Sequence, residues 1–176
     1  MNRLHYYSPE DIIDIEKAIC FLTNEYQKSG HNKKPVVGHS LRLGFYLLEK
    51  GYKKKVIIAG ILHDLLEDTD VSFQKISEIF GMEISNLVLS VTFDPKIIDP
   101  VEQYNNLFTK VLIKGRDAFI IKAVDLLMNS QYIHLVTDKR KRKGLIRKNM
   151  YFLSLFEEFK DELIYKILKQ EIENLE

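Results

Sequence analysis

The chain has little of what would place it outside a reducing compartment. Cys20 is the single cysteine among 176 residues, which excludes an intrachain disulfide. No apolar run is long enough to cross a bilayer, and residues 1–5 do not resemble a signal peptide. With four prolines and eight glycines, the sequence has no obvious linker, low-complexity segment or internal repeat. We therefore expect a cytoplasmic protein without a membrane partner.

The sequence also lacks an excess of charge of either sign. Its 26 Lys and Arg are balanced by 25 Asp and Glu, which gives a formal net charge of +1. Such a balance provides no overall field to attract nucleic acid or acidic lipid. The local exception is the basic run 139–143, which lies between two expected helices. We interpret it as a solvated loop, with nucleic-acid binding as the alternative, and we expect no nucleic-acid partner.

What is present fits one globular domain spanning 1–176. A hydrophobic share of 45% and a charged share of 29% are ordinary for a globular protein of this size. Apolar residues recur at helical spacing, and the short β-branched stretches continue into helical patterns. We therefore predict an all-α fold with a loop at 31–34. The expected helices span about 9–29, 35–50, 54–66, 72–80, 82–92, 101–113, 118–129, 146–159 and 162–175.

The most unusual stretch is 58–69, with the sequence IAGILHDLLEDT. It reads as an apolar helix that ends in one imidazole and several carboxylates, groups that are costly beside a core unless they are paired or bind a metal. On an ideal helix His63 and Asp64 point about 100° apart, so both reach one metal only if it lies over the backbone between them. Imidazole with carboxylate suits Mn, Fe, Zn or Ni better than Ca or Mg.

Two acids follow this pair at helical spacing. Glu67 lies one turn after His63 and Asp64, and Asp68 lies one turn after Asp64. A carboxylate in such a place can act as a base toward metal-bound water or as an acid toward a leaving group. The alternative is that both acids are merely solvated at the end of the helix, although acids are unfavourable at a helix C-terminus.

Other polar residues stand out in apolar helices. Asp125 lies among Ile, Ala, Val and Leu, with Lys122 three residues before it and Asn129 four residues after it. A buried carboxylate must be paired or bound, so Asp125 is either the partner of Lys122 or a metal ligand. His39, near the start of its helix, is by itself typical of a capping or surface residue.

The order of His39, His63-Asp64 and Asp125 resembles that of the HD superfamily of metal-dependent phosphohydrolases. The segments 35–39, 61–69 and 122–129, with a Phe-Gly helix end at 80–81 and Val-Thr at 91–92, are similar to the hydrolase domain of RelA/SpoT-type enzymes and their stand-alone small relatives. The similarity extends over residues 10–160. It implies an HD-domain helical bundle of about eight to ten helices.

The resemblance also implies roles for individual residues. One metal ion per chain, usually Mn²⁺ in the family, with another divalent transition metal as the alternative, would be held by His39, His63, Asp64 and Asp125. Glu67 and Asp68 would orient or activate the attacking water, and Asn129 would line the substrate site. Such relatives remove the 3′-pyrophosphate of guanosine tetraphosphate (ppGpp). The expected partner is therefore a small-molecule nucleotide, and whether the chain forms a homo-oligomer stays open.

The residues expected to recognise the nucleotide depart from the family pattern. With Gln27 as the anchor, Asn24 and Ser29 replace a His and a base-stacking Arg at the end of the first helix. Lys28 is the candidate replacement, although Lys stacks less well than Arg. Further departures, where the family has Tyr, Arg and His, are Val36, Leu126 and Met128. The metal ligands thus match the family, while the recognition shell differs.

These departures leave open which other residues contact the substrate and which nucleotide the substrate is. Arg147 and Tyr151 lie one helical turn apart and either form a surface pair or point at the substrate site. The first hypothesis for the function is a metal-dependent ppGpp 3′-pyrophosphohydrolase. The alternatives are an HD-type nucleotidase or phosphatase on another nucleotide, such as a deoxynucleoside monophosphate or a phosphorylated dinucleotide, and a non-catalytic nucleotide-binding HD domain.

Overall fold

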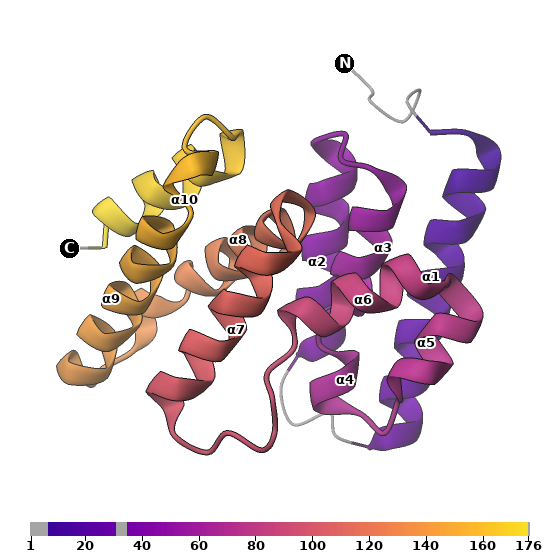
Figure 1. Cartoon of the computed structure of the whole chain (residues 1–176), viewed down its shortest axis with the longest axis horizontal. Coiled ribbons are helices and arrows are strands. Elements are labelled where there is room, and N and C mark those ends of the chain that lie inside the picture. Colours follow the sequence, from indigo (N-terminus) through magenta and orange to yellow (C-terminus); the bar gives the residue numbers. More distant parts are fainter. Residues whose placement is uncertain (1–6, 31–34, 176) are drawn as a thin grey trace.

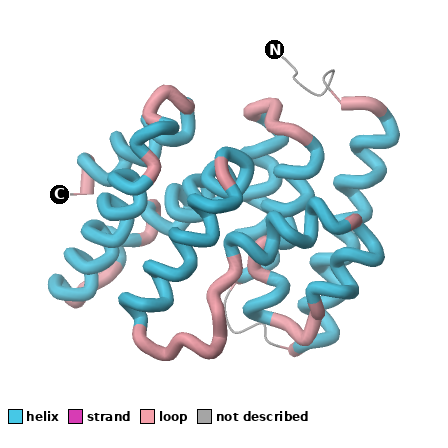
Figure 2. Tube along the Cα trace, in the orientation of Figure 1, coloured by secondary structure: helices cyan, strands magenta, loops and turns pink. Residues whose placement is uncertain are grey.

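The computed structural model describes residues 7–30 and 35–175, so the loop expected at 31–34 lies outside the described residues (Figure 1). Within these ranges the regular elements are all helices, which confirms the predicted all-α class (Figure 2). None of the described helices is both long and apolar enough to cross a bilayer. The elements are α1 (Pro9–Ser29), α2 (Val36–Glu49), α3 (Lys54–Leu62), α4 (Leu65–Asp68), α5 (Phe73–Phe80), α6 (Met82–Val91), α7 (Pro100–Lys114), α8 (Arg116–Ser130), η2 (Ile133–Leu135), α9 (Lys139–Leu155), η3 (Glu157–Phe159) and α10 (Leu163–Glu173).

Helix α1 begins and ends where the local sequence predicts. The hydroxyl of Ser8 accepts a hydrogen bond from the backbone N–H of Asp11, and the carboxylate of Asp11 accepts one from the N–H of Ser8, each at 3.1 Å. Pro9 occupies the first turn, where its missing N–H costs nothing. Gly30 ends the helix at φ +66°, a conformation that is strained for residues with a side chain.

Helices α3 and α8 form the centre of the molecule. Residues 56–62 of α3 are all buried, and so are residues 118–128 of α8. Helix α3 packs against α1, α2, α6 and α8. A helix that is apolar on every face must be surrounded, because each exposed face would leave apolar area in water. The two helices that carry the polar motif residues are therefore the two most deeply enclosed ones.

Helices α2 and α3 approach each other closely at two glycines. A Cβ atom added at Gly44 of α2 would lie within 3.0 Å of the side chain of Ile61, and one added at Gly60 of α3 would lie within 3.0 Å of the side chains of Leu43 and Leu47. The absence of both Cβ atoms lets Ile61 and Leu47 pack across the interface. The backbones of the two helices that carry His39 and His63 are thereby held close together.

An aromatic cluster attaches α9 to this centre. The ring of Phe119 on α8 stacks on Phe152 of α9, with centroids 5.7 Å apart and an interplanar angle of 6°. Phe108 of α7 packs edge-on against Phe152 with centroids 5.0 Å apart. Such aromatic pairs bury large apolar areas and have preferred geometries. The cluster therefore fixes which face of α9 is turned toward α7 and α8.

Two helix boundaries differ from the prediction. The helix expected at 54–66 ends at Leu62, and a two-residue turn at His63-Asp64 separates it from α4. Asp64 has φ −94° and ψ −5°, a sparsely populated backbone region that is common at active sites and that breaks the helical hydrogen-bond pattern. The angle of about 100° expected on an ideal helix therefore does not apply to this pair.

The basic run 139–143 was wrongly expected to form a loop. It forms the first turns of α9, because the carboxylate of Asp138 accepts hydrogen bonds from the backbone N–H groups of Arg140 and Lys141, at 2.8 and 3.0 Å. An Asp cap satisfies the unpaired donors of a helix start, and Lys and Arg are good helix formers. The cap outweighs the unfavourable placement of cations at the positive end of the helix dipole.

Candidate metal centre

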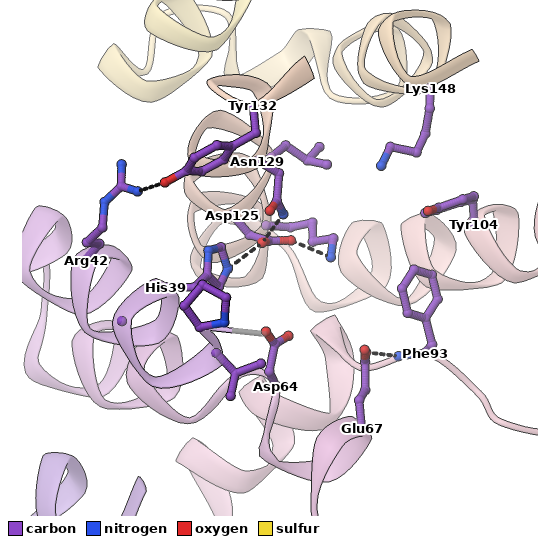
Figure 3. Close-up of a pocket in the computed structure, with 15 residues that line it drawn as sticks. His39, Arg42, Asp64, Glu67, Phe93, Tyr104, Asp125, Asn129, Tyr132 and Lys148 are labelled. Atoms are coloured by element: carbon purple, nitrogen blue, oxygen red, sulfur yellow. Dashed lines mark hydrogen bonds and ion pairs between the residues drawn. The ribbon is translucent and has the colours of Figure 1, made fainter. Parts of the chain in front are cut away.

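A cavity of about 650 Å³ opens between α2, the turn at 63–64, α7, α8 and α9 (Figure 3). Most of the polar motif residues line it, whereas His63 is buried beside it. Three of them, His39, His63 and Asp125, each offer one donor atom, and these atoms all lie within 4.8 Å of one another. The sequence separates these residues by up to 86 positions, and the packing of α2, α3 and α8 brings them together.

The distances within this group are short. Nε2 of His39 lies 3.1 Å from Oδ1 of Asp125, and Nε2 of His63 lies 3.8 Å from the same oxygen. Asp64 places its Oδ1 3.0 Å from Nε2 of His63. The two imidazole rings have centroids 5.2 Å apart. The structure thus gathers three of the four residues that the resemblance implies as ligands, His39, His63 and Asp125, and places the fourth, Asp64, in contact with His63.

The protonation of His63 is fixed by its backbone partner. Nδ1 lies 2.8 Å from the carbonyl oxygen of Gly60. Because a carbonyl can only accept, Nδ1 must carry the hydrogen, and in the neutral ring Nε2 keeps its lone pair. Nε2 is buried and makes no hydrogen bond within the described residues. An imidazole oriented by a backbone carbonyl, with its other nitrogen turned toward carboxylates, is the usual arrangement of a metal-binding histidine.

His63 and Asp64 each shift the pKa of the other. Burial lowers the pKa of His63, but the charges of Asp64 and Asp125 and the contact with Asp64 outweigh it and bring the pKa to about 9. Burial raises the pKa of Asp64, but His63 outweighs that effect and holds the pKa below its ordinary value. The site therefore favours a positive charge near these carboxylates. A divalent cation fits this environment and this set of nitrogen and oxygen donors.

Asp125 is the partner of Lys122, one of the two alternatives that the sequence left open, while its role as a metal ligand stays a prediction. Its Oδ2 accepts a hydrogen bond from Nζ of Lys122 at 2.7 Å, so the ion pair exists. Its Oδ1 faces His39 and also accepts a hydrogen bond from Nδ2 of Asn129 at 2.7 Å. One carboxylate oxygen thus serves the ion pair, while the other belongs to the cluster of donors.

Glu67 and Asp68 are placed differently, although they are adjacent on α4. Glu67 lines the cavity, and its Oε1 accepts a hydrogen bond from the backbone N–H of Phe93 at 2.6 Å. Burial raises the pKa of Glu67 above its ordinary value, against the opposing charge of Lys122. Asp68 does not line the cavity, and the hydroxyl of the buried Tyr26 donates to its Oδ2 at 3.3 Å. The two acids therefore do not form a pair with one environment.

The remaining predicted substrate residues divide in the same way. Asn129 lines the cavity, but Lys28, Arg147 and Tyr151 do not. The side chain of Lys28 is 68% exposed and pairs with Glu25 at 2.8 Å. Arg147 lines a separate cleft at the start of α9, and the ring of Tyr151 packs against Phe108 with centroids 6.1 Å apart.

The sequence reasoning missed several residues that do line the cavity. Lys148, next to Arg147, reaches it from α9, and its Nζ lies 4.6 Å from the centroid of the Tyr104 ring. Arg42 reaches it from α2 and donates to the hydroxyl of Tyr132 at 2.6 Å (Figure 3). Arg42 lies three residues after His39 and so on the same helix face, a signal that helical spacing could have given. Nothing local distinguished Lys148 from Arg147, because the packing of Phe152 against Phe108 and Phe119 sets the rotation of α9.

Comparison with known proteins indicates a family. The family described as HD domain matches residues 18–97, a segment that contains His39 and the His63-Asp64 pair. These residues therefore match an HD domain. The match includes three of the four candidate donors, and the histidine-aspartate pair lies in the turn that joins α3 to α4.

Several relatives of this HD domain are known. It is 30% identical over 149 residues to a guanosine-3′,5′-bis(diphosphate) 3′-pyrophosphohydrolase of Aquifex aeolicus, an alignment that covers 81% of the chain but 21% of that longer protein. It is 27% identical to the guanosine-3′,5′-bis(diphosphate) 3′-pyrophosphohydrolase MESH1 of Drosophila melanogaster, with 84% of the chain and 82% of that protein covered. The chain thus spans about a fifth of the length of the bacterial relative.

The fold of this HD domain has a solved counterpart. The structure of a metazoan ortholog of SpoT, described as hydrolysing ppGpp, superposes with a TM-score of 0.75 at 19% sequence identity. The superposition covers 92% of the chain and 93% of the metazoan chain. The helical arrangement described above is therefore shared over almost the whole length of both proteins.

Proposed function

We propose that this HD protein is a metal-dependent phosphohydrolase that acts on a pyrophosphorylated nucleotide, with ppGpp as the first candidate substrate. The observation that carries the proposal is the convergence of His39, His63 and Asp125, with Asp64 in contact with His63, beside a cavity of about 650 Å³. The relatives in Aquifex aeolicus and Drosophila melanogaster, both named as pyrophosphohydrolases of this compound, support it.

The metal would be held by His39, His63, Asp64 and Asp125, and we propose Mn²⁺ as the ion. Two imidazoles and two carboxylates suit a divalent transition metal better than Mg²⁺ or Ca²⁺, which prefer oxygen ligands. A divalent cation in this place supplies Lewis acidity toward a phosphoryl oxygen and lowers the pKa of a water molecule. The buried Nε2 of His63 supports the assignment, because it makes no hydrogen bond within the described residues and lies 3.0 Å from Oδ1 of Asp64, beside which a cation would be stabilised.

Glu67 is the residue that we assign to proton transfer. Its Oε1 is held by the N–H of Phe93, while its Oε2 makes no hydrogen bond within the described residues. Burial raises the pKa of Glu67 in the direction of neutral pH, and a general base or acid is most effective when its pKa lies near the working pH. Oε2 would take the proton of the attacking water and return it to the leaving oxygen. Asp68, fixed by Tyr26 away from the cavity, would support α4 from behind.

The cations of the cavity favour a substrate with negative charge at both ends. Arg42 and Lys148 lie on opposite sides of the donor cluster (Figure 3). Neither makes an ion pair with a carboxylate within the described residues, since Arg42 donates to Tyr132 and Gln131. Unpaired cations in a cavity bind phosphate groups well. A nucleotide phosphorylated at two positions would engage both of them, whereas a monophosphate would engage one.

Another phosphorylated nucleotide is the second candidate substrate, and one observation favours it. Lys28, the residue expected to replace the base-stacking Arg of the family, pairs with Glu25 and does not line the cavity. The planar pair of Arg42 and Tyr132, with the guanidinium carbon 5.9 Å from the ring centroid, offers a different surface for a base. Recognition of a base other than guanine follows naturally if that surface is used.

We also propose a cytoplasmic location for the protein. Cys20 is a free, exposed thiol, and such thiols persist in reducing compartments. The reducing cytoplasm is also where phosphorylated nucleotides are the available substrates of a hydrolase of this kind.

The decisive experiment is the release of pyrophosphate from ppGpp by the purified protein, with Mn²⁺ and with a chelator. We expect release that requires the metal and that is absent in the variant His63→Ala. A panel of GTP, GDP, deoxynucleoside monophosphates and phosphorylated dinucleotides identifies the preferred substrate. A protein that holds Mn²⁺ and hydrolyses other nucleotides, but not ppGpp, would move the assignment to the second candidate. A protein that holds Mn²⁺ and hydrolyses none of them would contradict the enzymatic function.

A further inference from the structure

Lys122 is a buried cation on the floor of the cavity that the proposed proton transfer does not use. It lies on α8, one turn before Asp125, and is 7% exposed. A lysine is rarely buried to this extent unless its charge is compensated. Its Nζ donates to Oδ2 of Asp125 at 2.7 Å, and it lies 5.4 Å from the centroid of the Phe93 ring. The ammonium group of Lys122 is therefore held by the carboxylate of Asp125 and by the ring of Phe93.

The ion pair controls how Asp125 can bind a metal. A carboxylate can coordinate through one oxygen or through both. Lys122 engages Oδ2, whereas Oδ1 lies 3.1 Å from Nε2 of His39 and 3.8 Å from Nε2 of His63. Oδ1 is thus the oxygen turned toward the other donors. Coordination of a metal through both oxygens of Asp125 would compete with the ion pair that Oδ2 makes with Lys122, whereas Oδ1 is held toward the other donors by the amide of Asn129 at 2.7 Å.

Phe93 links Lys122 to the acid that we assign to proton transfer. The ring of Phe93 faces the ammonium group of Lys122, and the backbone N–H of the same residue donates to Glu67. The charge of Lys122 accordingly lies between Asp125 and Glu67. The positive charge of Lys122 lowers the pKa of Glu67 and so opposes the effect of burial, as expected from this arrangement.

Lys122 contributes a positive charge directly beside the carboxylates of the site, in addition to the more distant cations Arg42 and Lys148. Asp64, Glu67 and Asp125 bring three negative charges to the cavity. One divalent cation would leave these carboxylates with a net charge of minus one beside an incoming phosphate, which is itself anionic. In two-metal sites a second ion supplies the missing positive charge and stabilises the oxygens of the phosphoryl group. Lys122 is a fixed positive charge already present in that environment.

We propose that Lys122 is the positioning residue of the metal centre: it restricts Asp125 to one coordinating oxygen and replaces a second metal ion as the fixed positive charge beside the phosphoryl group. The second part rests on the proposed function, whereas the first part concerns metal binding alone. The protein is accordingly expected to bind one divalent ion per cavity.

Two variants separate the two roles. Lys122→Gln keeps a hydrogen-bond donor for Oδ2 of Asp125 but removes the charge, while Lys122→Met removes both. The matched control is Lys55→Met, because Lys55 is also ion-paired, with Asp117 at 3.0 Å, but lies outside the cavity. Each variant is examined by Mn²⁺ titration, by the electron paramagnetic resonance spectrum of bound Mn²⁺ and by steady-state hydrolysis.

The expected results differ between the variants. In Lys122→Gln we expect one Mn²⁺ with an unchanged spectrum and a kcat lowered about 100-fold at similar KM, as for the loss of one preorganised stabilising group. In Lys122→Met we expect the same loss of kcat together with a changed spectrum and equal or tighter Mn²⁺ binding, because Asp125 gains a second free oxygen. Lys55→Met should match the unaltered protein in spectrum and kcat.

Other outcomes would overturn the proposal. Full kcat in Lys122→Gln would eliminate the charge role. An unchanged spectrum in Lys122→Met, or weaker Mn²⁺ binding in step with a lower melting temperature, would leave Lys122 as a purely structural residue. If Lys122→Met does not fold, a changed Mn²⁺ spectrum in Lys122→Gln would equally contradict the first role. Should the unaltered protein hydrolyse no nucleotide, the proposed function fails, while the spectra still decide the coordination of Asp125.

Discussion

The backbone N–H of Phe93 donates a hydrogen bond to Oε1 of Glu67 across 2.6 Å. The bond connects the segment after α6 with the short helix α4 and leaves the second oxygen of Glu67 facing the cavity. A short helix has few internal hydrogen bonds of its own, so this contact from outside orients its acid. The geometry of the proposed proton transfer therefore depends on a loop that contributes no catalytic side chain.

Glu67→Gln should separate metal binding from turnover. The amide oxygen can still accept from Phe93, so we expect unchanged folding and Mn²⁺ affinity. The loss of a general base or acid lowers kcat by about 10²–10⁴-fold. Steady-state kinetics with a parallel Mn²⁺ titration measures both. Full activity in this variant would remove Glu67 from the proposed mechanism.

Asp68→Asn should act on stability rather than on chemistry. The hydroxyl of Tyr26, which is fully buried, donates to Oδ2 of Asp68, and Asp68 does not line the cavity. Weakening one such hydrogen bond costs about 1 kcal/mol of unfolding free energy. We expect denaturant unfolding to show this loss in Asp68→Asn and in Tyr26→Phe, with kcat reduced far less than in Glu67→Gln. A stable Asp68→Asn protein as inactive as Glu67→Gln would instead place Asp68 in the chemistry.

Metal removal should lower the melting temperature through the cluster of His39, His63 and Asp125. A ligand that binds only the folded state at 100 times its Kd adds about 2.7 kcal/mol of stability. We expect Mn²⁺ to raise the melting temperature of the unaltered protein and to have little effect on His39→Gln. His134→Gln, at an exposed position of η2, is the matched control and should keep the full Mn²⁺ response. An equal response in His39→Gln would show that the ion binds elsewhere.

Lys148 should give substrate binding a pH dependence. Burial, with the neighbouring charge of Lys122, lowers the pKa of Lys148 to about 8. Its ammonium group is therefore present below pH 8 and lost above it, so KM for a phosphorylated nucleotide should rise between pH 7 and pH 9. Lys148→Arg keeps its charge throughout this range and should flatten the rise. If KM of Lys148→Arg rises as steeply as that of the unaltered protein, another group is responsible.

Local sequence signals predicted most helices, because caps and stops act within a few residues. The ends of α1 follow from Ser8-Pro9 and Gly30, and the end of α5 follows from Gly81. The break at His63-Asp64 was not predicted, since the apolar pattern continues through it. It arises from an Asp64 backbone that departs from the helix while the side chain turns toward His63.

The set of residues that form the site was harder to predict from the sequence than the fold. Residues that interrupt apolar helices, such as Asp125, could be recognised because burial makes a lone charge costly. Lys148 could not be separated from Arg147, because the rotation of α9 is set by the packing of Phe152 against Phe108 and Phe119. The different surroundings of Glu67 and Asp68 likewise depend on Phe93 and Tyr26, which are distant in sequence.

The close approach of α2 and α3 at Gly44 and Gly60 makes the donor set vulnerable to changes that involve no polar atom. A methyl group at either glycine would lie within 3.0 Å of a side-chain atom of Ile61, Leu43 or Leu47, so these side chains would have to shift and the contact between α2 and α3 would be repacked. A homologue could therefore retain every histidine and carboxylate of the motif and still hold His39 and His63 at a different separation.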